Sequence, residues 1–172
     1  NSMNPFRVEG QKTIVFEMLD QRDWQAPDWI VLPGGNLGNT SAFGKALREA
    51  YELDLINKMP RIAVIQAAGA APFYEMFVHG GEFKAVTNPE TLATALRIGD
   101  PVSWPKALHE VRSSNGTVEK VTEQEIADES LAGRRVAAIG LVPVAIPDQV
   151  GRRRGHHGAA VVNDRRQSTR PA

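Results

Sequence analysis

Residues 32–40 read Leu-Pro-Gly-Gly-Asn-Leu-Gly-Asn-Thr, and this stretch decides the fold because it joins a strand to a helix through a glycine-rich turn. The mainly apolar, β-rich residues 28–32 precede it, and residues 40–50 have helical spacing. Glycine allows a positive φ and a close approach to a ligand, which we expect of Gly34, Gly35 and Gly38. The helix directs its unpaired N–H groups and positive dipole end at the turn. The stretch therefore predicts an anion pocket that suits a phosphate.

A tight strand-to-helix turn without any ligand has the same glycine pattern, and spacing alone leaves this alternative open. The motif is not a Walker A loop, because no Gly-Lys-Ser/Thr closes it, and its glycine spacing differs from the dinucleotide fingerprint. Asn36 and Asn39 favour a phosphate loop. Asparagine tolerates left-handed backbone and offers amide hydrogen bonds, so the loop can surround a phosphate without a lysine.

Strand and helix patterns alternate along the rest of the chain. We expect strands at 29–32, 61–66 and 117–121, and helices at 13–19, 41–55, 71–78, 90–96 and 104–111. Thr122 and Glu125 form a capping box that opens one more helix. This alternation predicts an α/β fold with an open sheet, in which ligands bind at the carboxyl ends of the strands.

The composition limits the class of protein. The chain has 172 residues, 42% hydrophobic and 23% charged, with a net charge of zero and no cysteine. This is enough for one domain with a core, and it argues against nucleic acid or an anionic membrane as the main partner. The absence of cysteine excludes disulfides and thiolate metal ligands and fits a cytoplasmic protein. A start at Asn1 without a methionine leads us to expect a fragment whose N-terminal part is absent.

Residues 131–172 differ in charge from the rest. They hold eight arginines, no lysine and two acids, a net charge of +6 against −6 for residues 1–130. Arg152–Arg154 suits a nucleic-acid or membrane-binding arm, and His156 with His157 is a weak metal signal. We favour a shifted reading frame of GC-rich DNA, which sequencing the coding DNA would test, and we expect this unmatched tail to be disordered.

Four segments in order carry a family resemblance. The glycine–asparagine loop resembles the cofactor-phosphate loop of fold-type II pyridoxal-phosphate (PLP) enzymes, and residues 1–13, 65–72 and 90–104 narrow it to the threonine synthase family. The resemblance runs from Asn1 to about Ile126. It implies an open three-layer sheet of the tryptophan synthase β-like class, with residues 1–130 forming part of the large PLP domain.

The resemblance also implies specific roles. Threonine synthases are PLP-dependent lyases of threonine biosynthesis that convert O-phosphohomoserine and water to threonine and phosphate. The cofactor phosphate would be bound by Gly35, Asn36, Leu37, Gly38 and Asn39, with Ala95 against the pyridine ring. Asn1 and Arg7 fall where the family binds the substrate phosphate, a task that suits the planar arginine fork. By themselves, Arg7 is typical of a solvated surface, Ala95 of helix packing and Asn1 of a frayed terminus.

The Schiff-base lysine of the family lies upstream of the segment that matches Asn1. We therefore assign no catalytic residue in this chain, expect no metal, and expect the polypeptide alone to be inactive. The resemblance is compatible with a homodimer of the full-length protein. Two alternatives remain open: another fold-type II enzyme, such as a threonine or serine dehydratase, and a non-catalytic phosphate-binding module.

Overall fold

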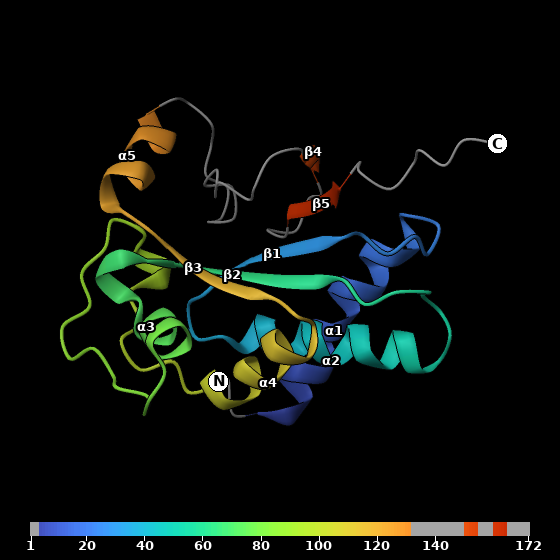
Figure 1. The fold of residues 1–172 in the computed structure, drawn as a ribbon, viewed down its shortest axis with the longest axis horizontal. Coiled ribbons are helices and arrows are strands. Elements are labelled where there is room, and N and C mark those ends of the chain that lie inside the picture. The colour runs from blue at the N-terminus through green and yellow to red at the C-terminus, as the bar shows by residue number, and fades with distance from the viewer. Residues whose placement is uncertain (1–3, 132–149, 155–159, 165–172) are drawn as a thin grey trace.

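The structure is a computed structural model that describes residues 4–131, 150–154 and 160–164 (Figure 1). Helices, short 3-10 turns (η) and strands alternate over most of this length. In chain order they are α1 (Pro5–Asp20), β1 (Trp29–Pro33), α2 (Gly38–Glu52), β2 (Arg61–Ala67), η1 (Ala68–Ala70), α3 (Pro72–His79), η2 (Thr94–Leu96), α4 (Trp104–Ser113), β3 (Thr117–Val121), α5 (Glu123–Leu131), β4 (Val150–Arg154) and β5 (Ala160–Asp164).

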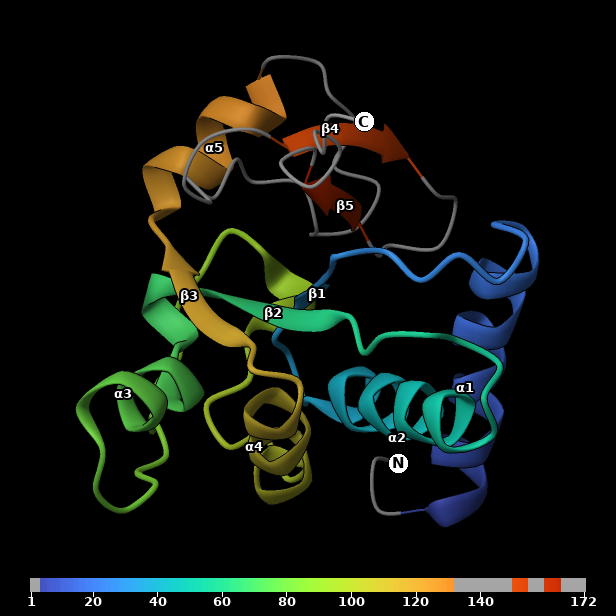
Figure 2. The same cartoon turned by 45° about the vertical axis from the view of Figure 1, so that its right-hand side comes forward.

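One sheet of five strands runs through the molecule in the order β3-β2-β1-β5-β4. The strands β1, β2 and β3 are parallel, and Pro33 at the end of β1 lies beside Ile65 of β2. Because the chain moves in one direction from β1 to β3, right-handed crossovers place the connecting helices on the same face. Figures 1 and 2 show α1 to α4 on that face and α5 on the other. The expected α/β fold with an open sheet is confirmed.

Side chains alternate between the two faces of the sheet, as the period of a strand requires. On the face covered by α1 to α4 lies the main core, which includes Ile30, Leu32, Ile62, Val64, Val118, Phe43, Leu47 and Val111. On the opposite face a smaller cluster of Val31, Ala63, Ile65 and Val121 packs against Ile126 of α5. The continuous apolar run of β2 is thus explained by burial on both faces.

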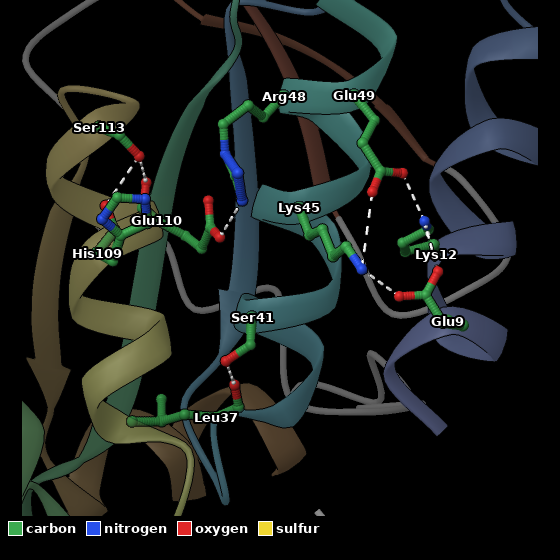
Figure 3. A network of polar contacts seen from close by, with 10 residues as sticks. All are labelled: Glu9, Lys12, Leu37, Ser41, Lys45, Arg48, Glu49, His109, Glu110 and Ser113. Atoms are coloured by element: carbon green, nitrogen blue, oxygen red, sulfur yellow. Dashed lines mark hydrogen bonds and ion pairs between the residues drawn. The ribbon is translucent and has the colours of Figure 1, made fainter. Parts of the chain in front are cut away.

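The first helix is longer than the sequence predicts, since α1 begins at Pro5 rather than near residue 13. Asn4 caps it by accepting a hydrogen bond from the Phe6 N–H, and proline occupies the first helical position. A ring of charges then joins α1 to α2, in which Lys12 binds Glu9 and Glu49, and Lys45 also binds Glu9 (Figure 3). The contacts fix the first half of α1 beside the middle and the last turn of α2.

The expected helix at 90–96 is wrong, because only the 3-10 turn Thr94–Leu96 forms there. The backbone is held by distant partners instead: the Glu90 N–H donates to Gly69 O and the Leu92 N–H to the Glu123 carboxylate. We call residues 90–98 the strap. Local helix propensity is outweighed here by tertiary hydrogen bonds to residues that are far away in the sequence.

Two strands lie in the arginine-rich segment beyond residue 131. Strand β5 (Ala160–Asp164) pairs antiparallel with β1. Strand β4 (Val150–Arg154) pairs antiparallel with β5 and forms the edge of the sheet. Neither strand was predicted from the sequence pattern. Residues 132–149, 155–159 and 165–172, and with them His156 and His157, lie outside the described residues. The domain boundary near residue 130 and the disorder of the tail therefore stay predictions.

None of the helices in the described part of the chain is long and apolar enough to cross a membrane. The same residues contain no group of three or more His, Cys, Asp or Glu side chains that could hold a metal ion.

A half-buried ion pair joins α2 to α4, where Arg48 Nη2 lies 2.7 Å from Glu110 Oε1 (Figure 3). The Glu110 side chain is only 7% exposed, and burial raises the pKa of its carboxyl although Arg48 lowers it. Because the folded-state pKa is raised, the stability that this group contributes is present at low pH and is lost as the pH rises through the folded-state pKa.

Arg48→Met should therefore destabilise the protein more at pH 7 than at pH 5. We expect a loss of about 2 kcal/mol at pH 7, below the usual cost of breaking a fully buried pair because Arg48 is partly exposed. Urea unfolding at the two pH values measures the loss. The double variant Arg48→Met/Glu110→Gln is the control, since it leaves no charge to titrate; an equal loss at both pH values in the single variant would contradict the prediction.

Candidate functional site: a phosphate cradle at the start of α2

The carboxyl edge of the sheet gathers the loops that follow β1 and β2. The first amide of the glycine loop still belongs to the sheet, because the Gly34 N–H donates to Ile65 O at 2.7 Å. Gln66, which is fully buried in β2, donates from Nε2 to Gly34 O at 2.9 Å and accepts from the Tyr74 N–H. This one side chain fixes the glycine loop against the first turn of α3.

The glycines of the loop act through their size and not through a positive φ, so that part of the sequence prediction is wrong. The left-handed residue is Leu37, with φ 62° and ψ 11°, and the described glycines with positive φ are Gly80 and Gly81. A Cβ on Gly34 would lie 2.6 Å from Gln66 Cγ. The missing side chain of Gly34 therefore allows the loop to pack closely on β2.

The backbone from Gly35 to Asn39 contains N–H groups that are available to donate hydrogen bonds to a ligand. The first hydrogen bond of α2 runs from the Ser41 N–H to Leu37 O. Within the described residues, the N–H groups of Gly35, Leu37, Gly38 and Asn39 have no acceptor. Such amides at the positive end of a 15-residue helix form an anion-binding site.

A buried hydroxyl at the same helix end has no partner. Thr40, in the first turn of α2, is fully buried, and its Oγ1 forms no hydrogen bond with a described residue. An unsatisfied hydroxyl of this kind is unfavourable, and side chains at a helix start lean towards the N-terminus of the helix. The atom therefore fits an anion bound at the beginning of α2, such as the phosphate of PLP.

The strap packs directly on this loop. A Cβ on Gly35 would lie 3.1 Å from Leu96 Cδ2 and 3.5 Å from Ala95 O, so these predicted site residues lie together. Ala95 itself is exposed. The side chain of Asn36 reaches the segment that leads into α4, where its Oδ1 accepts the Val102 N–H at 3.0 Å. The structure thus joins the loop after β1 to a segment about sixty residues further along the chain.

Of the two residues predicted to bind the substrate phosphate, the structure describes only Arg7. Arg7 lies exposed in the first turn of α1, and its guanidinium forms no ion pair with a described residue. Asn1 lies outside the described residues. An open groove of about 500 Å³ runs between the first turns of α1, α2 and α4, with Pro5, Ser41, Lys45 and Pro105 among its walls. Gly35–Asn39 and Ala95 do not line it, so this groove is separate from the predicted cofactor site.

Sequence reasoning missed three residues that shape the site. Gln66 carried a signal, since it is a polar residue within an apolar strand, whose side chain must find partners when buried. Thr40 is the last residue of the stretch 32–40 but was assigned only to the helix that begins there. Glu123 binds the strap, a contact 31 residues apart in the sequence that no local pattern reveals.

Taken together, these features define an α/β domain with a candidate phosphate cradle at the carboxyl edge of its sheet and a strap packed on the glycine loop. Residues 1–138 match the model of the family described as "Pyridoxal-phosphate dependent enzyme", and the chain belongs to this family, which confirms the resemblance inferred from its motifs. PLP is accordingly the cofactor of its family.

Curated relatives and solved structures agree with this placement. The chain is 44% identical over 152 residues to a threonine synthase of Methanocaldococcus jannaschii, and 47% identical over 132 residues to threonine synthase 2, chloroplastic, of Arabidopsis thaliana. These alignments cover 88% and 74% of this chain but only 38% and 25% of the relatives. The solved structure of a T.th. threonine deaminase superposes on 77% of the chain and 47% of its own length with a TM-score of 0.60 at 19% identity, which shows the shared fold.

Proposed function

We propose that this chain is part of a threonine synthase that converts O-phosphohomoserine and water to threonine and phosphate. Relatives at 41–47% identity bear that name, although the chain spans less than half of their length. The observation that supports the cofactor site most directly is the buried Thr40 hydroxyl, which has no hydrogen-bond partner among the described residues, next in the chain to loop N–H groups that have no acceptor there. A homodimeric assembly and a cytoplasmic location stay predictions.

We assign the cofactor phosphate to the backbone of Gly35, Asn36, Leu37, Gly38 and Asn39. The positive end of α2 favours a dianion there, and the small residues of the loop allow it to come close to the backbone. Ala95, held beside Gly35 by the strap, would lie against the pyridine ring, where a side chain of one methyl group lets the ring lie flat. When bound, PLP supplies an electron sink for negative charge on substrate carbons.

The substrate phosphate is assigned to Arg7 and Asn1. A guanidinium can donate two parallel hydrogen bonds to phosphate oxygens, and Arg7 is exposed at the start of α1 without a competing ion pair among the described residues. The ring of charges holds the first half of α1 against the middle and the last turn of α2, and Pro5 and Ser41, in the first turns of the two helices, line one groove. In this arrangement the chain binds two phosphates and so orients the substrate relative to the cofactor.

The substitution Thr40→Val tests the cradle, because valine keeps the shape of threonine and removes only the hydroxyl. We expect the affinity of the chain for PLP to fall about tenfold, the effect of losing one hydrogen bond to a charged group. The stability of the ligand-free protein should stay equal or rise, since a buried unpaired hydroxyl is removed. Equilibrium dialysis and urea unfolding measure the two effects.

Two controls make this test specific. Pyridoxal lacks the phosphate, so it should bind equally to the wild type and to Thr40→Val. Ser41→Ala removes the neighbouring hydroxyl, which already donates to Leu37 O at 2.9 Å, and should lower stability without a comparable loss of PLP affinity. If Thr40→Val leaves PLP binding unchanged, the phosphate does not contact this hydroxyl, and failure of the wild type to bind PLP would contradict the proposed site.

A further inference from the structure

The strap is fixed at its beginning by one carboxylate from the other face of the sheet. Glu123 Oε2 accepts a hydrogen bond from Thr91 Oγ1 at 3.0 Å and another from the Leu92 N–H at 2.8 Å. The Thr91 hydroxyl in turn accepts the Ala93 N–H at 3.1 Å, so the carboxylate organises three consecutive residues. Hydrogen bonds to an ionised acceptor are about twice as strong as neutral ones, which suits a single anchoring point.

The anchor itself is rigid. Glu123 is the first residue of α5, and the capping box next to it is formed on both sides: the Thr122 N–H donates to Glu125 Oε2 at 2.7 Å, and the Glu125 N–H donates to Thr122 Oγ1 at 3.2 Å. A carboxylate in a first helical turn is also favoured by the helix dipole. The position of Glu123 is therefore set by α5 and not by the strap.

The strap passes through a narrow space between this anchor and η1. A Cβ on Gly69 would lie 1.8 Å from Glu90 O, and the Glu90 N–H donates to Gly69 O at 3.1 Å. At its other end the strap reaches the glycine loop, where Leu96 contacts Gly35. Because the beginning of the strap is held by Glu123 and its end lies on the loop, the position of Ala95 depends on both.

We propose that Glu123 is a positioning residue for the cofactor ring, because its carboxylate fixes the strap that presents Ala95. This inference rests on the proposed function, since it assigns the ring of PLP to Ala95. Glu123 does not touch the cofactor; it acts through Thr91 and Leu92. The role differs from that of the glycine loop, which binds the phosphate. Removing the Glu123 carboxylate should therefore weaken binding of the PLP ring more than binding of a phosphate.

Glu123→Ala in the full chain tests the proposal. We expect the dissociation constant for PLP to rise about tenfold, as two charge-assisted hydrogen bonds are lost, while that for inorganic phosphate changes less than about threefold. Hydrogen exchange of the amides at 91–98 should become faster. Glu123→Gln keeps an oxygen that can accept both bonds, so it should restore most of the affinity and of the exchange protection.

Glu125→Ala is the matched control, because Glu125 lies in the same first turn of α5 and contacts Thr122 but not the strap. It should lower the melting temperature and leave both PLP affinity and exchange at 91–98 unchanged. The inference is overturned, while the proposed function stands, if Glu125→Ala lowers the affinity for PLP as much as Glu123→Ala does. It is also overturned if Glu123→Ala speeds hydrogen exchange at 91–98 without lowering the affinity for PLP. A wild type that binds no PLP contradicts the proposed function, and the inference falls with it.

Discussion

Replacing Arg7 by leucine is expected to lower kcat/KM for O-phosphohomoserine by at least about 100-fold, or about 2.7 kcal/mol of transition-state binding. The background is a chimera in which residues of this chain replace the matching segment of the Methanocaldococcus jannaschii relative, to which it is 44% identical. Removal of the guanidinium takes away two charge-assisted hydrogen bonds and leaves a substrate dianion without its main countercharge. Phosphate release measures the rate.

The controls separate recognition of the phosphate from a general charge effect. Arg7→Lys keeps the charge but loses the planar fork, so part of the loss should remain. Arg61→Leu removes an arginine at the opposite edge of the sheet, where it begins β2 and lies 5.3 Å from the Trp29 ring, and should leave kcat/KM nearly unchanged. If Arg7→Leu behaves like Arg61→Leu, the substrate phosphate is bound elsewhere.

The parts of the fold that follow from local patterns were predictable from the sequence. The strand patterns at 29–32, 61–66 and 117–121 match β1, β2 and β3 within one residue at either end. The capping box of Thr122 and Glu125 is formed as expected. These signals depend on residues that are neighbours in the chain, and burial in the sheet acts in the same direction as their intrinsic preferences.

Features set by distant contacts were not predictable in this way. The segment 90–96 carries residues that are compatible with a helix, yet hydrogen bonds to Gly69 and Glu123 hold its first residues outside a helix, and only the 3-10 turn Thr94–Leu96 forms. Likewise, the pairing of Ala160–Asp164 with β1 joins residues some 130 positions apart. Hydrogen bonds over such separations depend on the completed sheet, and no window of neighbouring residues encodes them.

The phosphate chemistry of the candidate site stays a prediction, and the geometry of its loop differs from what the sequence indicated. The glycine–asparagine loop indicated a phosphate-binding site. In the structure this loop precedes α2, and the N–H groups of Gly35, Leu37, Gly38 and Asn39 have no acceptor among the described residues. The expectation that its glycines adopt positive φ was wrong, because the left-handed residue of this loop is Leu37, whose buried side chain compensates for the strained backbone. Gly34 and Gly35 are needed because Gln66 packs against the first and Leu96 against the second.

Gly44, inside α2, is a position where a larger side chain should strongly lower the stability of the protein. Gly44 lies in the middle of the helix, where glycine costs about 1 kcal/mol relative to alanine. A Cβ at this position would lie 2.3 Å from Glu110 Cβ and 2.5 Å from Glu110 Cγ. The close approach of α4 to α2 therefore explains why the helix carries a residue that it would otherwise disfavour.

Gly44→Ala is accordingly expected to destabilise the protein by about 3 kcal/mol or more despite the gain in helix propensity, since overpacking forces the two helices apart. Urea unfolding measures the loss, and Gly10→Ala is the control: a Cβ on Gly10 meets nothing within 4 Å, so alanine in α1 should stabilise by up to about 1 kcal/mol. The loss at Gly44 should be the same at pH 5 and pH 7, because an overlap of carbon atoms does not titrate. A loss confined to pH 7 would show instead that only the Glu110 carboxylate is displaced from Arg48, and an unchanged stability would show that α4 can move away freely.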